Sequence, residues 1–497
     1  MEPAGVSSYR EGVDMVTGTP RVAIVGAGMA GLCMAAKLRQ AGFDDFVVHE
    51  RADEVGGTWR DNTYPGLSCD VPARFYSFSF APNPGWTRNF APGAEIQRYF
   101  VRSSAELGLR PHIRFRSAIT EAGWDGRRYR LHTADGATDH ADVLIAATGI
   151  LREPKTPDIP GIGTFDGAAF HSARWDHSVP LRGKKVAVIG TGSTGVQITS
   201  ALAGVAAPLK LFQRTPQWIL PLPRLPYSAA SRAALANAPK LNRLSYRAYQ
   251  TIMEQIFGKA AVEPGWQRSG VAAVCRSYLR MAIPDRRLRA KLTPPDDPMC
   301  KRLIMSAAFY PAVRRDDVDL VTAGIERIEP TGIRTTDGRL HEADVLVFAT
   351  GFDAHAFLRP MELTGEDGRT LDEAWRDGPR GYRTVAVPGF PNFFTLIGPH
   401  SPIGNHSLIA IAETQADYVL RWLERMRAGE ASSIVPTAEA TDEFNAALRG
   451  AMPSTVWTTG CDSWYLGADG VPELWPWTPA VHRDMLAEPV PAHFRIA

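Results

Sequence analysis

The chain has 497 residues, 44% of them hydrophobic and 22% charged, which is long enough for two or three globular domains and excludes intrinsic disorder. Its 55 basic and 53 acidic residues leave a formal charge of +2, so there is no electrostatic reason to expect nucleic acid or an anionic membrane as a partner. The five cysteines are odd in number and never spaced as C-x-x-C, which argues against a disulfide framework, a zinc finger and a redox dithiol.

Two other absences bear on the location of the protein. Residues 1–20 have no apolar core of signal-peptide length and are expected to be an N-terminal extension. The sequence has no uninterrupted apolar run of about 18 residues, so no membrane-spanning helix is predicted. A cytoplasmic protein without a metal, a membrane or a protein partner is therefore expected.

A repeated strand–helix–strand pattern gives the first indication of the fold. The apolar run 21–26 predicts a buried parallel strand, 29–40 a helix and 45–50 a second strand. The pattern restarts at Lys185, with a strand, a helix from about Ser193 and a strand over 209–214. Two such units indicate an α/β protein with two nucleotide-binding domains.

The first unit carries a glycine fingerprint, Gly26-Ala-Gly28-Met-Ala-Gly31, between its strand and its helix. Glycines at this spacing permit a tight turn, close approach of a pyrophosphate, and near contact between helix and strand. Glu50 ends the next strand, where a carboxylate accepts hydrogen bonds from a ribose diol and repels a 2′-phosphate. This pattern favours FAD or NAD over NADP.

The second unit carries another copy of the fingerprint, with a different residue at the end of its second strand. Arg214 stands where the first unit has Glu50, and a guanidinium can bind a phosphate through two hydrogen bonds. The assignment is therefore FAD to the first unit and NADPH to the second. The predicted NADPH-binding residues are Gly190, Gly192, Ser193, Thr194, Gly195, Arg214 and Thr215.

Two nearly identical segments indicate how the domains are connected. ADVLIAATGI begins at Ala141 and ADVLVFATGF at Ala343, and each predicts a buried strand followed by a Thr-Gly turn. The second domain is then inserted in the first, as in glutathione-reductase-like proteins with two Rossmann-like domains. The predicted parts are an FAD-binding domain (21–150 and 352–497), an NADP-binding domain (151–220 and 293–351) and a helical insertion (221–292).

The helical insertion has an apolar stripe at helical spacing, formed by Leu241, Leu244, Ala248, Ile252 and Ile256. The pattern favours ordinary core packing, with coverage of a substrate cavity as the alternative. One more long helix is predicted over 407–427, and the chain after about Met452 is aromatic and proline-rich without clear periodicity.

Two longer motifs carry a resemblance to a known family. Residues 165–176 read FDGAAFHSARWD, and residues 56–70 read GGTWRDNTYPGLSCD. They resemble the F-x-G-x-x-x-H-x-x-x-W-[P/D] and GG-x-W-x-x-x-x-[Y/F]-P-G-x-x-x-D signatures of type I Baeyer–Villiger monooxygenases. The resemblance extends from about Arg21 to at least Pro402, and the residues that carry the first signature are Phe165, Gly167, His171, Trp175 and Asp176.

The resemblance implies a reaction with NADPH, O2 and a small-molecule ketone. NADPH would reduce FAD, oxygen would form a C4a-peroxyflavin, and one oxygen atom would enter next to the ketone carbonyl to give an ester or lactone. The family's catalytic arginine would be Arg302, with Asp70 positioning it and contacting the cofactor, and Lys301 would reach the NADP 2′-phosphate. A permanent positive charge suits this role because arginine keeps its proton at working pH.

Other residues of the motifs have less defined roles. His171 and Trp175 are interpreted as coupling the two domains, with general-base chemistry as the alternative for the histidine. Gly57, Trp59 and Tyr76 are expected to contact the flavin, although the two aromatic residues could equally be core residues. His400 and Ser401, in the run GPHSPIGN, are expected to shape the substrate pocket.

Three rival functions remain open at this point. A flavin-containing monooxygenase would oxidise N or S atoms through the same flavin cycle, but Trp175, Asp176 and Arg302 argue against it. A pyridine-nucleotide disulfide reductase needs a redox dithiol, and the sequence has no C-x-x-C motif. A non-catalytic NADPH-binding module would lack bound flavin.

Overall fold

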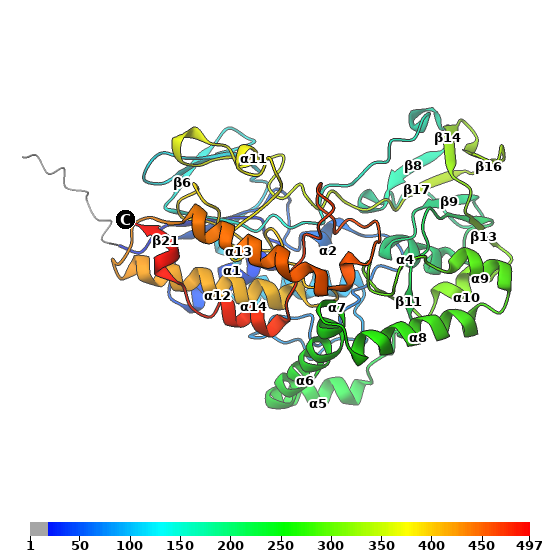
Figure 1. Cartoon of the computed structure of the whole chain (residues 1–497), viewed down its shortest axis with the longest axis horizontal. Helices are drawn as coiled ribbons and strands as arrows, with labels where there is room; N and C mark the ends of the chain where they lie inside the picture. The colour runs from blue at the N-terminus through cyan, green and yellow to red at the C-terminus, as the bar shows by residue number, and fades with distance from the viewer. Residues whose placement is uncertain (1–17) are drawn as a thin grey trace, which may run out of the picture.

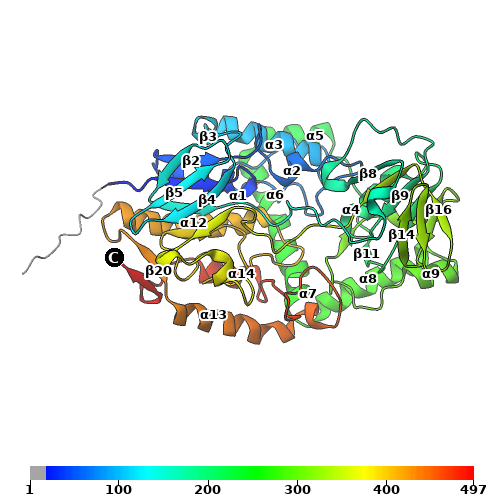
Figure 2. The same ribbon diagram turned by 90° about the horizontal axis from the view of Figure 1, so that it is seen from above.

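Two five-stranded parallel sheets form the framework of the computed structural model, which describes residues 18–497. They lie at opposite ends of the molecule, as two perpendicular views show (Figure 1, Figure 2). The first sheet has the order β19-β7-β1-β2-β3, with strands Phe393–Thr395, Val143–Ala146, Val22–Val25, Phe46–His49 and Ile113–Arg114. The second has the order β13-β10-β9-β17-β8, with strands Val318–Val321, Leu209–Phe212, Val186–Ile189, Val345–Phe348 and Ala168–His171.

The central strands of both sheets are short apolar runs that are buried along their whole length. Strands β1 (VAIV), β7 (VLIA), β9 (VAVI) and β17 (VLVF) have no exposed residue, as expected where helices cover both faces of a parallel sheet. Helices α1 (Met29–Gln40) and α12 (Leu408–Arg427) pack against each other on the first sheet, and α4 (Ser193–Leu202) and α10 (Phe309–Val313) on the second. The two predicted strand–helix–strand units are therefore present, one in each sheet.

Smaller sheets and helices extend this framework. A four-stranded sheet contains β18, β4, β5 and β6 (Glu362–Thr364, Ile119–Trp124, Tyr129–Thr133 and Thr138–Ala141). An antiparallel sheet contains β14, β15 and β16 (Ile325–Glu329, Gly332–Thr335 and Leu340–Glu342), and two strand pairs are β11 with β12 (Ile219–Leu220 and Ile304–Met305) and β20 with β21 (Ile434–Pro436 and Phe494–Ile496). The further helices are α2, α3, α11, α13 and α14 (Thr58–Asp61, Gly93–Glu106, Leu371–Ala374, Ala438–Ala451 and Pro479–Met485).

The chain passes from the first sheet to the second and returns through two adjacent segments. Lys155 N donates a hydrogen bond to Gly351 O (3.0 Å), and Asp353 N donates to Glu153 O (2.9 Å). These contacts lie where the Thr-Gly turns predict the crossings. The predicted N-terminal extension lies outside the described residues except for residues 18–20.

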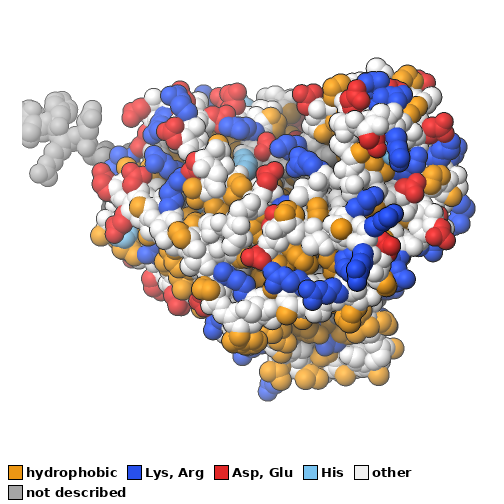
Figure 3. Space-filling view, turned by 45° about the vertical axis from the view of Figure 1, so that its right-hand side comes forward, with side chains coloured by type: hydrophobic (Ala, Val, Ile, Leu, Met, Phe, Trp, Pro, Cys, Tyr) orange, Lys and Arg blue, Asp and Glu red, His pale blue; other side chains and the backbone are white. Residues whose placement is uncertain are grey.

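The segment 221–292 is helical, with α5, α6, α7, α8 and α9 over Ala229–Asn237, Pro239–Ile252, Lys259–Val262, Trp266–Ala282 and Arg286–Leu292. The prediction that its apolar stripe packs in a core is wrong. Leu241, Leu244 and Ile252 are 47%, 62% and 47% exposed. Figure 3 shows the hydrophobic surface of this helical part at the bottom of the molecule.

The buried face of α6 is less apolar than its exposed face. Asn242 and Tyr246 are its buried residues, and the Asn242 side-chain amide donates a hydrogen bond to Pro82 O (3.2 Å). Periodicity identifies an apolar face of a helix but not the surface that this face meets.

The cysteine spacing argues against a disulfide framework, yet one pair of the five cysteines is bonded. Cys300 and Cys461 form a disulfide between residues 161 positions apart, while Cys33, Cys69 and Cys275 are buried thiols. A single bond across that separation has no signature in cysteine spacing. Among residues 18–497, no helix has both the length and the apolarity required to span a membrane.

Candidate functional site

One large cavity lies between the two sheets and brings most of the predicted residues together. Its volume is about 1830 Å³. It is lined by both glycine fingerprints, the Asp70 and Lys301-Arg302 segments, the two crossing segments, and residues 462–464 and 466–468. A cavity for a single drug-sized ligand usually measures about 300–1,000 Å³, so this one has room for more than one ligand. No residue of the helical insertion, 221–292, lines the cavity directly.

The glycines of the first fingerprint divide into packed and open positions. A Cβ atom on Gly31 would lie 1.8 Å from Gly26 O, so this glycine permits the close contact of α1 with the turn. A Cβ on Gly28 would meet nothing closer than Gly57 Cα, at 3.8 Å. Gly28 therefore leaves an open cradle at the N-terminus of α1, where backbone N–H groups and the helix dipole favour a phosphate.

The second fingerprint has the same division. A Cβ on Gly195 would lie 2.0 Å from Gly190 O, whereas one on Gly192 would meet no atom within 4 Å apart from its chain neighbours. Ser193 and Thr194 begin α4 beside this open position. The residues at both fingerprints thus fit a dinucleotide pyrophosphate.

The residues that follow β2 and β10, the second strand of each strand–helix–strand unit, differ in charge, as the sequence indicates. Glu50 is 3% exposed, and Arg214 is exposed. Both line the cavity together with Thr215, whose carbonyl accepts a hydrogen bond from Thr191 Oγ1 (2.8 Å). An acidic group at one cofactor site and a cation at the other match an unphosphorylated and a phosphorylated ribose.

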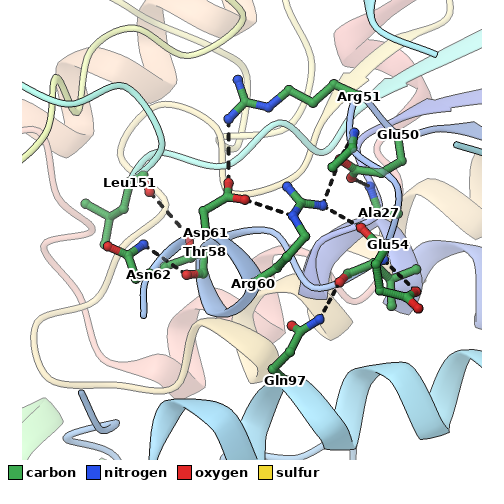
Figure 4. A network of polar contacts seen from close by, with 12 residues as sticks. Ala27, Glu50, Arg51, Glu54, Thr58, Arg60, Asp61, Asn62, Gln97 and Leu151 are labelled. Atoms are coloured by element: carbon green, nitrogen blue, oxygen red, sulfur yellow. Dashed lines mark hydrogen bonds and ion pairs between the residues drawn. The ribbon is translucent and has the colours of Figure 1, made fainter. Parts of the chain in front are cut away.

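Glu50 is held by a polar network that sequence reasoning missed (Figure 4). Its carboxylate accepts hydrogen bonds from Ala27 N (2.8 Å) and Ala52 N (2.9 Å), and from Arg60 Nη1 (2.9 Å). Arg60 also donates to Glu54 O (2.6 Å) and to Asp61 Oδ1 (2.8 Å). Arg60 lies inside the 56–70 motif, so this motif orients the carboxylate of the first fingerprint.

Asp70 and Arg302 form a two-point ion pair on the cavity wall. Arg302 Nη2 donates to Asp70 Oδ1 (2.7 Å) and Nε donates to Asp70 Oδ2 (3.0 Å), and the two side chains are 30% and 16% exposed. Burial by itself favours a neutral guanidinium, but the charge and hydrogen bonds of Asp70 outweigh it and keep the pKa of Arg302 above its usual value. Arg302 is therefore a permanent cation in the cavity.

Lys301 has a partner of its own. Its Nζ lies 3.0 Å from Asp296 Oδ2, and both side chains are largely buried. Lys301 also lines the cavity. To bind a 2′-phosphate, Lys301 would have to contact the phosphate in addition to Asp296, or break its ion pair with Asp296.

The predicted flavin-side aromatics contact each other on the cavity wall. Trp59 Nε1 donates a hydrogen bond to Tyr76 Oη (3.1 Å), and Tyr76 Oη lies 3.7 Å from Met29 Sδ. Burial raises the pKa of Tyr76 well above its usual value, so the phenol stays protonated. A Cβ on Gly57 would lie 3.2 Å from Gly28 Cα, which brings the 56–70 motif against the first fingerprint.

The residues of the 165–176 signature lie outside the cavity wall. His171 ends β8, accepts a hydrogen bond at Nδ1 from Ala173 N (3.1 Å), and packs its ring edge-on against Phe352 at 5.9 Å. Phe352 lies on the returning crossing segment. The position of His171 favours coupling between the two halves over direct proton transfer.

The other signature residues have structural contacts. A Cβ on Gly167 would lie 2.4 Å from Asp344 O, and Phe165 packs on the same sheet. Trp175 is buried against Phe170, with ring centroids 5.1 Å apart, and Asp176 accepts hydrogen bonds from the backbone and hydroxyl of Ser178 (2.9 and 2.6 Å).

Sequence reasoning also missed a contact between the 56–70 motif and the second sheet. Tyr64 Oη donates to Gln197 Oε1 (3.1 Å) on α4, and the Gln197 amide donates to Ser68 O (3.0 Å). A Cβ on Gly66 would lie 2.6 Å from Gln197 O. The motif therefore contacts both nucleotide sites through its Tyr64-Pro65-Gly66 segment.

His400 and Ser401 are buried but do not line the cavity. Burial lowers the pKa of His400 to about 4, and Ser401 Oγ accepts a hydrogen bond from Gln415 Nε2 (2.8 Å). Their neighbours Pro402, Gly404 and His406 line it instead. The sequence could have indicated that His406 lines the cavity, because His406 stands two residues before α12. The N-terminus of α12, which carries a positive partial charge, meets the cavity at Leu408.

Comparison with known sequences identifies relatives over nearly the whole chain. The family described as "FMO-like: Flavin-binding monooxygenase-like" matches residues 19–227. An uncharacterized monooxygenase of Mycobacterium tuberculosis is 54% identical over 475 residues, which cover 96% of each chain. A Baeyer–Villiger monooxygenase of Streptomyces coelicolor is 42% identical over 471 residues, which cover 93% of this chain and 90% of that one.

Solved structures of similar shape cover the chain as fully. A steroid monooxygenase bound to NADP has a TM-score of 0.85 at 31% identity, covering 96% of this chain and 99% of that one. OTEMO in complex with FAD and NADP has a TM-score of 0.86 at 28% identity, covering 97% and 100%. With this agreement between the sequence relatives, the fold and the two nucleotide-type fingerprints, the chain belongs to the Baeyer–Villiger monooxygenase family of flavin-binding monooxygenases.

Proposed function

We propose that this enzyme, an FAD- and NADPH-dependent monooxygenase of the Baeyer–Villiger type, inserts one oxygen atom of O2 next to the carbonyl of a small-molecule ketone by the peroxyflavin route, giving an ester or lactone. The observation that carries this proposal is the Arg302–Asp70 ion pair, which stands on a cavity wall shared by both cofactor sites. A cytoplasmic location, where NADPH is produced, belongs to the same proposal.

The cofactor-binding residues divide between the two ends of the cavity. FAD would bind residues 21–150 and 352–497, with its pyrophosphate at Gly28, its ribose at Glu50 and its ring system near Trp59 and Tyr76. NADP would bind residues 151–220 and 293–351, with its pyrophosphate at Gly192 and its 2′-phosphate at Arg214, Thr215 and Lys301. The helical insertion, 221–292, contributes to neither site.

FAD, once bound, would supply the redox chemistry, which is acceptance of hydride from NADPH and reaction with O2. Arg302 stabilises the negative charge that develops on oxygen, because a partly buried cation that is already fixed in place costs no reorganisation during the reaction. Asp70 holds the guanidinium at two points and so fixes its direction. The positive end of α12 adds a fixed partial charge at the same cavity.

The test is the replacement Arg302→Ala, assayed with NADPH, O2 and a panel of ketones by mass spectrometry of the products. We expect ester or lactone formation to disappear while NADPH is still consumed, with its electrons recovered as hydrogen peroxide. Arg302→Lys keeps the charge but loses the two-point geometry, so little product should return. Arg276→Ala is a matched control, because Arg276 also pairs with an aspartate (Asp297) but lies exposed and away from the cavity. Coupled ester formation in Arg302→Ala would refute the proposal.

A further inference from the structure

Exposed large hydrophobic side chains gather on the helical insertion, 221–292. Among residues 18–497, nine large hydrophobic side chains are exposed, and seven of them belong to this segment. The seven are Leu225, Leu241, Leu244, Ile252, Trp266, Val274 and Met281. Single exposed apolar residues are ordinary on a protein surface, whereas apolar residues gathered in one region mark a surface that meets a partner.

Helices α6 and α8 each present a stripe of these side chains to solvent. On α6, Leu241, Leu244 and Ile252 share one face at 3.6 residues per turn. On α8, Trp266 and Met281 share one face and are 73% and 74% exposed. Helices α5, α6 and α8 lie along the lower side of the molecule in Figure 1, where α5 and α6 project beyond the rest. The apolar stripes therefore belong to a projecting part of the protein.

The same segment is strongly basic. It contains 13 of the 55 Lys and Arg residues and 3 of the 53 Asp and Glu residues, so it carries a formal charge of +10 and the rest of the chain −8. Lys240, Arg243 and Arg247 are exposed on α6 beside its apolar stripe. In the part of the chain that the structure describes, these three cations form no ion pair, and the pairs of the insertion involve Arg276 and Glu254 instead.

The net charge of the whole chain hides this separation of charge. A total of +2 gives no reason to expect an anionic partner, but a segment of +10 does. Figure 3 shows Lys and Arg side chains bordering the hydrophobic surface at the bottom of the molecule. Hydrophobic and basic side chains side by side on a surface helix are typical of helices that lie in the interface of an anionic membrane.

We propose that the helical insertion docks this enzyme on an anionic phospholipid surface, with the apolar stripes of α6 and α8 below the headgroups and the cations of α6 at the lipid phosphates. A second copy of the chain fits this surface less well, because two segments of +10 would face each other and repel. The inference goes beyond the proposed function and does not depend on it, since no residue of the insertion lines the cavity.

The test measures co-sedimentation of the FAD-loaded enzyme with vesicles made of equal parts of phosphatidylglycerol and phosphatidylcholine, and with vesicles of phosphatidylcholine alone. We expect binding to the anionic vesicles at about 0.1 M salt and loss of most of it at about 1 M salt, where surface charges are screened. Binding to phosphatidylcholine alone should be at least about tenfold weaker. Anionic vesicles should slow hydrogen exchange in residues 239–252 and 266–282.

Two double variants separate the apolar contribution from the charged one. Leu241→Ser/Leu244→Ser should weaken vesicle binding at least about tenfold, because two leucine side chains no longer enter the lipid. Arg243→Gln/Arg247→Gln should weaken it roughly 25-fold, since each Lys or Arg near an anionic surface contributes about a fivefold factor. Size-exclusion chromatography with light scattering, without vesicles, measures the oligomeric state of the same proteins.

Matched controls change the same kinds of side chain elsewhere on the surface. Leu340→Ser alters an exposed leucine of β16, and Arg127→Gln/Arg128→Gln removes two exposed charges from the turn between β4 and β5. These controls should bind the anionic vesicles within about twofold of the unmodified enzyme, as expected for surface sites away from the contact. Flavin content, Tm and NADPH consumption without vesicles should be the same in every variant.

Three results would overturn this inference. One is equal binding to the two kinds of vesicle, and another is unchanged binding in either double variant of α6. The third is a dimer that Leu241→Ser/Leu244→Ser converts to a monomer, because a second copy of the chain would then cover the stripes. None of these results bears on the proposed function, which Arg302→Ala tests separately.

Discussion

Removal of the Asp70 carboxylate tests how much the enzyme depends on a fixed guanidinium. In Asp70→Ala, Arg302 loses the hydrogen bonds of 2.7 and 3.0 Å and remains a cation with 30% of its side chain exposed. Hydrogen bonds to charged groups contribute about 1.5–3 kcal/mol each. Because the arginine side chain is partly solvated, we take about 2–3 kcal/mol for the pair, or a roughly 30- to 150-fold loss of correctly held Arg302.

We expect Asp70→Ala to bind FAD and to remain yellow, because the carboxylate orients Arg302. Flavin reduction should slow, and product formation should fall by about the factor given above. The assay combines anaerobic stopped-flow reduction by NADPH with quantification of product and hydrogen peroxide. Asp297→Ala breaks an exposed pair with Arg276, which is worth about 0–1 kcal/mol, and should change neither rate.

Two results would refute this reasoning. Asp70→Ala with the product yield of the unmodified enzyme would show that the ion pair does not position the catalytic cation. A colourless apoprotein would show that Asp70 is needed for FAD binding itself.

Three further predictions concern the cofactor sites and the pH dependence of stability. Arg214→Ala should weaken NADPH binding by roughly ten- to a hundredfold and leave NADH binding unchanged, as measured by cofactor titration, and an unchanged preference for NADPH would contradict the assignment. Gly31→Ala should lower the Tm of the apoprotein, because its Cβ would lie 1.8 Å from a backbone oxygen, whereas Gly28→Ala should keep the Tm and lose FAD affinity. Burial lowers the pKa values of His406 and His482 to about 4 and about 3, so below pH 6.5 the unfolded state binds protons that the folded state does not. Chemical denaturation should therefore show stability falling by up to about 1.4 kcal/mol per pH unit and histidine between pH 6.5 and pH 4, and His482→Gln should reduce this slope.

The fingerprints were predictable because the features that define them are local. A four-residue apolar strand, a glycine turn and a helix start are written in consecutive residues, so α1 was expected over the residues that it occupies. The difference between Glu50 and Arg214 follows from one position in each unit. Helix α12 was likewise expected to within one residue, from its own periodicity.

The sequence predicts the three roles that the glycines of a fingerprint fulfil, but it does not show which glycine fulfils which role. The coordinates separate Gly31, whose missing side chain permits helix contact, from Gly28, which leaves room for a ligand. That separation depends on where the backbone of neighbouring segments lies, including Gly57 of the 56–70 motif.

The arrangement around Arg302 was decided by tertiary structure. Asp70 and Arg302 are 232 positions apart, and their pairing was expected only through the family resemblance. Cys300 and Cys461 meet only because the C-terminal segment returns to the cavity, and Arg60 becomes a partner of Glu50 only once α2 has packed beside the first sheet. Contacts between distant segments leave no periodic or spacing signal in the chain.

The apolar stripe of α6 likewise separates what the sequence determines from what tertiary packing determines. Leu241, Leu244 and Ile252 share one face because an α-helix has 3.6 residues per turn, and that much follows from the sequence. Their exposure follows from the opposite face, where Tyr246 and Asn242 meet the rest of the protein. Local backbone geometry determines which residues lie together on a helix, and only the packing of distant segments determines which face is buried.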